Sequence, residues 1–387
     1  MTRLAILLVL TITAYGAQGQ NAVPAPPELP AKAYLLIDAN SGQVIVEHNA
    51  DQQLPPASLT KMMTAYVLAE EINAGRVSEQ DMVRISENAW SQNPTFQGSS
   101  LMWIEPGKDV SIADLQRGII ISSGNDATLA VAEHIAGTEA VFAEMMNNSA
   151  KKLGMDSSHY VNSHGLPDPA HKTTARDLAK LAKAMINDHP EQYKIYKELE
   201  FTYNNIRQYN RNTLMLSDSS VDGIKTGHTE EAGFCLVASA QRSDMRLISV
   251  VLGSASTKTR KKETAALFNY GFHFYQTRTV YSAGEELDKP RVWMGLQDHV
   301  SVGVREKVVL TLPRGSQEKL ETDLELIPEL MAPLVLGDRI GTAYLKLDGE
   351  TLKEVPVVVL SPVAEAGFFA RLWDRVLMFI TELFSAV

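Results

Sequence analysis

The chain lacks several features that mark common functional classes. It has one cysteine in 387 residues, Cys235, so no disulfide can form within the chain, and the apolar run around it predicts a buried thiol. No Gly-rich phosphate loop, HExxH pair or other metal-ligand spacing is present, so no cofactor or metal is expected. Acidic residues (46) outnumber Lys and Arg (36), and the net charge of −10 argues against nucleic acid as a partner.

No apolar run near the N-terminus is long enough to span a bilayer. Residues 4–15 are apolar but too few for a transmembrane helix. They follow Arg3 and precede small residues up to Gly19, which is the pattern of a secretory signal peptide. We therefore expect residues 1–19 to be removed on export, and the Pro-rich segment 20–30 to form an extended linker.

Three short motifs carry most of the functional information. Each has a structural explanation when it stands alone: a helix cap with a surface lysine, a turn before a helix, and an edge strand with a basic side chain. Together they spell SxxK, SxN and KTG, a set found in serine acyl-transfer enzymes. In chain order they are Ser58-Leu59-Thr60-Lys61, Ser123-Gly124-Asn125 and Lys225-Thr226-Gly227.

The first motif supplies a nucleophile and a base. An apolar run without Gly or Pro follows Ser58 and predicts a buried helix, so Ser58 and Lys61 should share one helix face. A serine hydroxyl needs a base to take its proton, and a lysine can serve only if its pKa falls. Burial lowers a lysine pKa, and Lys225 is the candidate second cation that would lower it further.

With these motifs the chain resembles the low-molecular-weight penicillin-binding proteins, which are D-alanyl-D-alanine carboxypeptidases of the penicillin-binding protein 5 group. The resemblance covers nearly the whole chain. We expect His164 and Asp177, which fall in it, to be structural. Further matching segments are Asn162-Ser163-His164-Gly165-Leu166, Thr174-Ala175-Arg176-Asp177-Leu178-Ala179, Asn210-Arg211-Asn212 and Val221-Asp222-Gly223-Ile224.

The resemblance implies a role for each catalytic residue. Ser58 would attack the carbonyl between two D-alanines at the end of a peptidoglycan stem peptide, and Lys61 would take its proton. Ser123 would pass a proton to the leaving amine with the help of Lys225. Asn125 would hold both the substrate amide and Lys61. The same resemblance makes β-lactams acylating inhibitors.

The resemblance also implies a set of substrate-binding residues. Thr226, Gly227 and His228 would line the bound peptide, and the backbone N–H of His228 would form the oxyanion hole with that of the nucleophile. Arg211 and Arg260 would hold the terminal carboxylate, which a guanidinium fork matches well. Taken alone, each arginine is expected to be a solvated surface charge.

The length allows two or three domains. Residues 31–275 alternate strand-like and helix-like segments in a way that predicts one antiparallel sheet packed with helices, an α+β fold. This agrees with the β-lactamase/DD-peptidase-like catalytic domain that the resemblance implies. Helices are expected at Asp126–Ala136, Glu139–Leu153 and Ala175–Asn187, and strands at Tyr34–Asp38, Gln43–Glu47, Gly233–Ser239 and Leu247–Val251.

The last third of the chain has a different pattern. Residues 276–362 are rich in β-forming residues and turn signals, and they predict a small all-β domain that acts as a spacer. Residues 363–387 predict an amphipathic helix, and 366–387 carry four charged residues, which argues against a membrane span. Such a helix either packs on a domain or lies on a membrane surface, and its terminal position and its Phe and Trp residues favour the membrane. By resemblance, it would hold the protein in the periplasm at the outer face of the cytoplasmic membrane.

Three other functions remain open from the sequence. A β-lactamase would share the motifs, but class A enzymes use a Glu in an ExxLN segment, and this chain has no Leu-Asn dipeptide. A DD-endopeptidase would cut peptide cross-links with the same residues. A penicillin-binding scaffold with little turnover would also keep the fold, although the motifs are intact.

Overall fold

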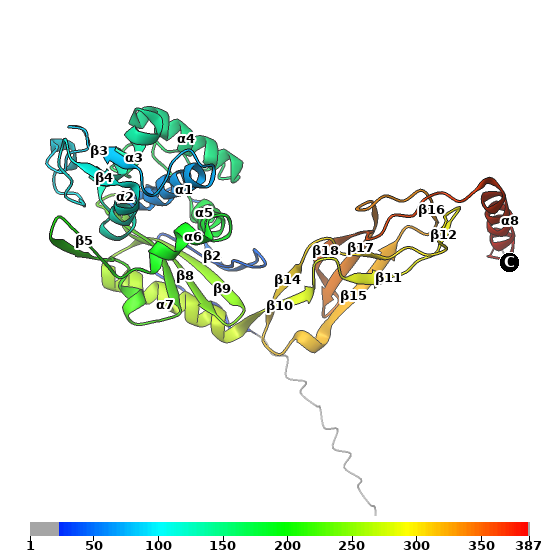
Figure 1. Cartoon of the computed structure of the whole chain (residues 1–387). Helices are drawn as coiled ribbons and strands as arrows, with labels where there is room; N and C mark the ends of the chain where they lie inside the picture. The colour runs from blue at the N-terminus through cyan, green and yellow to red at the C-terminus, as the bar shows by residue number, and fades with distance from the viewer. Residues whose placement is uncertain (1–22, 386–387) are drawn as a thin grey trace, which may run out of the picture.

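The computed structural model describes residues 23–385, with side chains up to Ile380. The expected signal peptide, 1–19, and the start of the 20–30 linker lie outside the described residues. The chain forms two bodies joined end to end, with a helix at the far end of the second body (Figure 1). The α+β fold class is confirmed: a sheet packed with helices precedes an all-β body and a C-terminal helix.

The first body is built on a five-stranded antiparallel sheet in the order β2-β1-β9-β8-β7. Side chains of β9 alternate between two cores: Ile248 and Val250 face one, whereas Leu247 and Val251 face the other. The sheet is therefore covered on both faces. Its strands are β1 (Ala33–Asp38), β2 (Val44–His48), β7 (Val221–Thr229), β8 (Gly233–Arg242) and β9 (Met245–Ser254).

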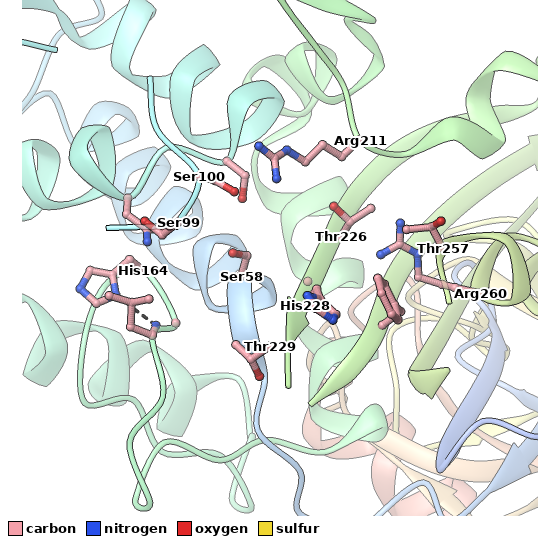
Figure 2. Close-up of a pocket in the computed structure, with 17 residues that line it drawn as sticks. Ser58, Ser99, Ser100, His164, Arg211, Thr226, His228, Thr229, Thr257 and Arg260 are labelled. Atoms are coloured by element: carbon pink, nitrogen blue, oxygen red, sulfur yellow. Dashed lines mark hydrogen bonds between the residues drawn. The ribbon is translucent and has the colours of Figure 1, made fainter. Parts of the chain in front are cut away.

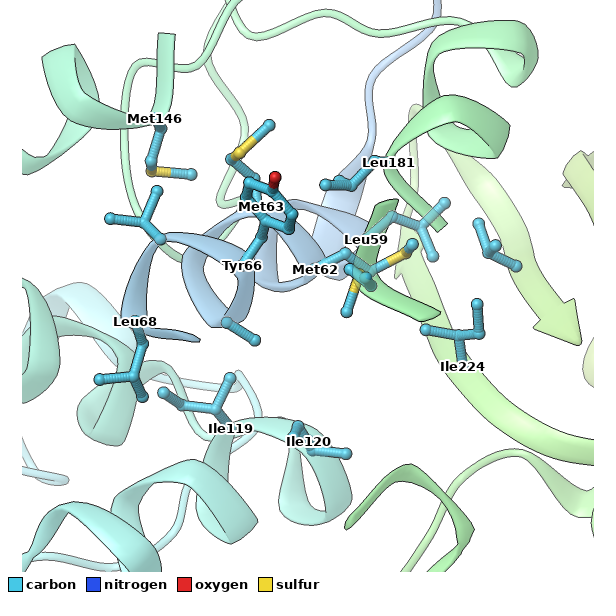
Figure 3. Close-up of a cluster of buried hydrophobic side chains, with 14 of the residues drawn as sticks. Leu59, Met62, Met63, Tyr66, Leu68, Ile119, Ile120, Met146, Leu181 and Ile224 are labelled. Atoms are coloured by element: carbon cyan, nitrogen blue, oxygen red, sulfur yellow. The ribbon is translucent and has the colours of Figure 1, made fainter. Parts of the chain in front are cut away.

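Helices from the middle of the chain cover one face of this sheet, and a later helix covers the other (Figure 1). The first helix, α1 (Thr60–Asn73), is buried nearly all round, as its apolar sequence predicts, and its side chains fill the core in Figure 3. The others are α2 (Ile112–Arg117), α3 (Asn125–Ala136), α4 (Glu139–Lys152), α5 (Ala175–Asp188), α6 (Pro190–Tyr193) and α7 (Thr257–Phe274).

The expected helices and strands are present, with small shifts at their ends. Thr138 and Thr174 cap α4 and α5, since each side chain accepts a bond from a backbone N–H in the first turn. Short strand pairs flank the helices: β3 (Met82–Arg84) with β4 (Asp109–Ser111), and β5 (Glu200–Tyr203) with β6 (Ile206–Tyr209).

The second body is all β apart from a 3₁₀ turn, Gln317–Lys319, and it has its own core of Val, Leu and Ile side chains. A five-stranded sheet runs β11-β13-β18-β17-β15, and two smaller pairs are β10-β14 and β12-β16. The strands are β10 (Tyr275–Tyr281), β11 (Glu286–Asp288), β12 (Val292–Trp293), β13 (Val302–Gly303), β14 (Val308–Pro313), β15 (Leu320–Leu326), β16 (Leu330–Met331), β17 (Arg339–Leu347) and β18 (Glu350–Val359).

A buried carboxylate joins the two bodies. Asp38, fully buried at the end of β1, accepts hydrogen bonds from the hydroxyls of Thr277 and Thr311 in the second body, the latter at 2.8 Å. Arg314 donates to the carbonyl of Phe272 at 2.9 and 3.1 Å. One carboxylate oxygen of Asp38 accepts backbone N–H groups of the first body, and the other accepts both hydroxyls of the second body, so the buried acid fixes how the two bodies are oriented.

The C-terminal helix, α8 (Phe368–Ser385), lies across the far end of the second body (Figure 1). Its Asp374 carboxylate accepts the N–H of Met294 at 2.6 Å, and Arg371 pairs with Glu365 at 3.0 Å. Of the predicted apolar side, Phe369 and Trp373 are 84% and 64% exposed, while the side chains of Leu383 and Phe384 lie outside the described residues. No helix in the described part of the chain is long and apolar enough to cross a membrane.

Candidate active site

The SxxK motif stands at the start of α1, the first helix of the first body. We call this body the catalytic body because it carries all three motifs, and we call the second one the β body. Ser58 lies in a 3₁₀ turn, Ala57–Leu59, that runs directly into α1 after two prolines. Lys61 is in the first turn of α1 and only 1% exposed. Its Nζ lies 3.2 Å from Ser58 Oγ, so the predicted contact across three residues is present.

The surroundings of Lys61 favour the neutral form of its amine. Its Nζ also donates to Asn125 Oδ1 and to the carbonyl of His164, each at 2.6 Å. Burial lowers the Lys61 pKa to about 7, helped by the charge of Arg211. In the neutral amine these two acceptors take both N–H groups, so the lone pair is left facing Ser58 Oγ. The amine is thus oriented to accept the serine proton.

Two cations act on Lys61. Lys225, the second cation expected from the sequence, is buried, which lowers its pKa well below the usual value, and the charges of Lys61, Arg211 and Arg260 lower it further. Repulsion between two charged amines is mutual, so it disfavours the protonated form of Lys61 as well. Arg211 adds a positive charge that lowers the Lys61 pKa, which the sequence did not indicate.

The SxN motif presents a second hydroxyl to the same cleft. A π-helical segment, Gly118–Ser122, leads to Ser123, which adopts a left-handed backbone conformation with φ 60°. Lys225 Nζ donates to Ser123 Oγ at 2.9 Å and to the Thr226 carbonyl at 3.0 Å. Ser123 and Lys225 therefore form a second hydroxyl–amine pair, which the family resemblance implied.

Asp126, which the sequence did not single out as a functional residue, holds the segment that directly follows the cleft-lining residues Ser99 and Ser100. Its fully buried carboxylate accepts the backbone N–H groups of Met102 and Trp103 at 2.8 Å and of Ile104 at 3.2 Å. Gly124 is required beside it, because a Cβ there would lie 2.7 Å from Asp126 Oδ1. The sequence signals were its place in the family-like segment Ser123-Gly124-Asn125-Asp126-Ala127 and its position in the first turn of α3.

The KTG motif lies on β7, the edge strand, as predicted. Gly227 lets this strand approach the nucleophile turn, since a Cβ there would meet the carbonyl of Pro56 at 3.0 Å and Leu59 at 3.3 Å. The His228 ring stacks on Phe234, with centroids 4.0 Å apart. The strand thus brings Thr226 and the His228 backbone beside Ser58.

Two arginines lie along the β7 side of the cleft (Figure 2). Arg260 on α7 is 6% exposed and donates to the Cys235 carbonyl at 3.1 Å, so the expectation of a solvated surface charge is wrong for it. Arg211 is open to solvent from the cleft, and partial burial still lowers its pKa. Neither has a carboxylate within ion-pair distance among the described residues.

The side chains of His164 and Asp177, which were expected to be structural, have partners of their own within the fold. The His164 ring accepts the Leu166 N–H and faces Glu139 Oε1 at 3.4 Å, and burial lowers its pKa to about 3. Its backbone carbonyl, which the sequence did not indicate, is the part that contacts Lys61. Asp177 accepts the N–H and hydroxyl of two adjacent serines. Cys235 is buried, and burial raises its thiol pKa to about 11.

All ten predicted site residues meet around one cleft of about 420 Å³, either lining it or, for Lys61 and Lys225, lying directly behind it. Figure 2 shows Ser58 between Ser99 and His164 on one side and Thr226, Arg211 and Arg260 on the other. Ser99, Ser100 and Thr257 also line the cleft without any signal in the sequence. The arrangement suits acyl transfer to Ser58 from a substrate that carries a carboxylate.

Both the catalytic body and the β body match known protein families. Residues 20–256 match the family described as D-alanyl-D-alanine carboxypeptidase, and residues 275–365 match the family described as penicillin-binding protein 5, C-terminal domain. The D-alanyl-D-alanine carboxypeptidase DacC of Escherichia coli is 44% identical over 385 residues, which is 99% of this chain and 96% of that protein. DacA of the same species is 45% identical over 361 residues, covering 92% and 90%.

A solved structure of similar shape is penicillin binding protein 5 from Haemophilus influenzae. It superimposes with a TM-score of 0.86 at 42% identity and covers 88% of this chain and 100% of that one. The matches extend over the catalytic body and the β body alike. The chain therefore belongs to the D-alanyl-D-alanine carboxypeptidase family of serine peptidases, the penicillin-binding proteins that also carry the penicillin-binding protein 5 C-terminal domain.

Proposed function

We propose that Ser58 is the nucleophile with which this serine peptidase removes the terminal D-alanine from peptidoglycan stem pentapeptides. The observation that carries the assignment is the orientation of Lys61. Both N–H groups of the neutral amine have acceptors at 2.6 Å, so its lone pair faces Ser58 Oγ. With a pKa of about 7, the amine is a competent base near neutral pH.

The acylation step uses both hydroxyl–amine pairs. Lys61 takes the Ser58 proton as Oγ attacks the penultimate carbonyl, and the backbone N–H groups of Ser58 and His228 bind the oxyanion. The C–N bond then breaks as Ser123 gives its proton to the leaving D-alanine, and the proton that Lys61 took from Ser58 replaces it on Ser123. Lys225, which donates to Ser123 Oγ, holds that hydroxyl in place during the transfer. Water later cleaves the acyl ester and restores the Ser58 hydroxyl.

Substrate selection would rest on the two arginines, which have no carboxylate partner among the described residues. Arg211, Arg260 and the Thr226 hydroxyl lie on the side of the cleft where the terminal carboxylate of the peptide would bind. The carboxylate of a β-lactam fits the same place, which accounts for acylation by penicillins. Asn125 would hold the substrate amide while it orients Lys61.

The direct test is release of D-alanine. The chain from residue 20 onward is incubated with a pentapeptide ending in D-Ala-D-Ala, and free D-alanine and the tetrapeptide are measured beside a Ser58→Ala control. Equal amounts of both products, from the wild type alone, are expected. A wild type that keeps covalent penicillin labelling but releases no D-alanine, and instead cuts cross-linked dimers, would contradict the carboxypeptidase assignment in favour of an endopeptidase.

We also infer that the protein is exported and held on the outer face of the cytoplasmic membrane by residues 366–387. The support is the apolar side of α8, on which Phe369, Leu372, Trp373 and Phe379 are all more than half exposed. A helix with one apolar and one charged side binds in the plane of the lipid interface. The all-β body then separates the catalytic cleft from the lipid.

Removal of residues 366–387 is expected to release an active protein from membranes. The deleted chain should stay in the supernatant after sedimentation with vesicles, because the apolar side of α8 is lost. Its D-alanine release from a soluble peptide should equal that of the full chain, which controls for folding. Sedimentation of the deleted chain with vesicles would contradict the assignment of α8 as the anchor.

A further inference from the structure

Exposed apolar side chains gather at one end of the β body. Outside α8, this body has six exposed large hydrophobic residues among those described, and five lie at the end away from the catalytic body. Leu296, Val335 and Leu336 are 67%, 61% and 64% exposed, and Ile327 and Met331 are 50% and 47% exposed. We call these five residues the apolar tip.

Backbone pairing brings the segments of the tip together. Strands β12 and β16 pair side by side, and Leu334 pairs with Val363. Residue 327 directly follows β15, at the end of that strand that points away from the catalytic body (Figure 1). In Figure 1 the tip segments around β12 and β16 lie next to α8.

The helix α8 is held against this same end. The N–H of Ala366 donates to the Met294 carbonyl at 2.8 Å, and the Met294 N–H donates to Asp374 on the helix at 2.6 Å. Leu296, two residues further on, donates its N–H to the Ala364 carbonyl at 2.8 Å. Because the charged side of α8 faces the β body through Asp374, its apolar side stays exposed beside the tip.

We propose that the apolar tip is a second lipid-contacting surface, which enters the bilayer interface beside α8. The proposal rests on the attachment of α8 proposed above. Soluble proteins rarely leave a contiguous apolar patch exposed unless it binds something. Continuity with the apolar side of α8 selects the bilayer, because a helix at the interface brings the tip to the same depth.

Polar groups at the edge of the tip limit how deeply it enters. Glu329 is exposed within the 327–337 loop, and Asp338 accepts the Val335 N–H at 2.8 Å. Arg291 lies over the ring of Trp293, 3.8 Å from its centroid, an amphipathic pair suited to the headgroup level. The tip therefore enters only the boundary between headgroups and acyl chains, as α8 does.

Contacts of both α8 and the apolar tip with the membrane would fix the orientation of the β body, which α8 alone would leave free. A helix lying on the membrane leaves the attached body free to tilt about it, whereas a second contact from the body itself removes that freedom. The Asp38 junction then transmits the orientation to the catalytic body. The cleft is consequently held at a set distance and direction above the lipid.

A single fluorescent label tests the proposal. Cys235 is 1% exposed, so a Leu336→Cys variant of the full chain can be labelled at one site with an environment-sensitive dye. We expect a blue shift and a severalfold rise in emission when phosphatidylethanolamine–phosphatidylglycerol vesicles are added. The same label at Lys319→Cys, at the opposite end of the β body, should not respond. A third label at Phe369→Cys reports on α8.

The three labels separate the two proposals. Responses at both 369 and 336 support the tip contact. A response at 369 without one at 336 overturns it and leaves the attachment by α8 intact. No response at either position overturns both.

A charge substitution gives an independent measure. The double variant Val335→Asp, Leu336→Asp, with α8 intact, is expected to lower the vesicle partition coefficient by about tenfold, since two apolar side chains lose their burial. The matched control Leu352→Asp, 43% exposed but outside the tip, should leave it unchanged. Unchanged partitioning of the double variant, or a change only in its oligomer mass, overturns the lipid contact.

Discussion

Replacement of Lys61 by methionine is expected to slow acylation of Ser58 by roughly 10³- to 10⁴-fold, the range that a positioned general base contributes. Methionine keeps most of the buried stem but cannot accept the serine proton. The measurement is the second-order rate of labelling by a fluorescent penicillin, with circular dichroism to show that the fold is kept. A Lys61→Met variant that is labelled within tenfold of the wild-type rate would remove Lys61 from the role of base.

The same assignment sets the pH profile of the wild type. A base must be neutral to act, and the Lys61 pKa of about 7 means that the amine is neutral above this pH and protonated below it. The acylation rate should therefore rise with pH and reach half its maximum near pH 7. Arg211→Gln removes a positive charge that disfavours the protonated amine, so the midpoint should move to higher pH.

Parts of the site that depend on local geometry were predictable from the sequence. Ser58 and Lys61 are three residues apart at the start of a run that the sequence predicts to be a buried helix, so their contact follows from helical spacing. The KTG strand was identified by the apolar strand that follows it. Gly227 then fits because the nucleophile turn approaches its backbone closely.

Parts that depend on long-range packing were not predictable. The His164 carbonyl meets Lys61 across 103 residues of chain, and a backbone acceptor leaves no mark in side-chain chemistry. The Arg211 charge lowers the Lys61 pKa only because the folded chain brings these distant residues together, and no local pattern in the sequence indicates this. Helix α7, which carries Arg260, was not predicted from the sequence. Its first half is rich in charged residues and its second half contains a glycine and several aromatic residues, so the helical period of apolar residues is not visible.

Replacing both Arg211 and Arg260 is the second change expected to have a large effect on catalysis. The double variant Arg211→Gln, Arg260→Gln is expected to lower kcat/KM for a peptide ending in a free D-Ala carboxylate by about 10²- to 10³-fold. Each charge-assisted hydrogen bond to the carboxylate contributes about 1.5–3 kcal/mol, and the two arginines act on the same group. Neither guanidinium has a carboxylate of the described chain to satisfy it, so both are available to the substrate.

A peptide amidated at its C-terminus distinguishes two roles of the arginines: binding the substrate carboxylate and holding the shape of the cleft. It lacks the charge that the arginines bind, so the wild type should already cleave it slowly, and the double variant should lose only a few-fold more. The difference between the two substrates therefore isolates the interaction between arginine and carboxylate. Arg260 also donates to the Cys235 carbonyl. An equal loss of kcat/KM on both substrates would therefore mean that Arg260 maintains the shape of the cleft and does not bind the terminal carboxylate. A loss confined to the carboxylate substrate would establish why the enzyme acts at the end of a peptide.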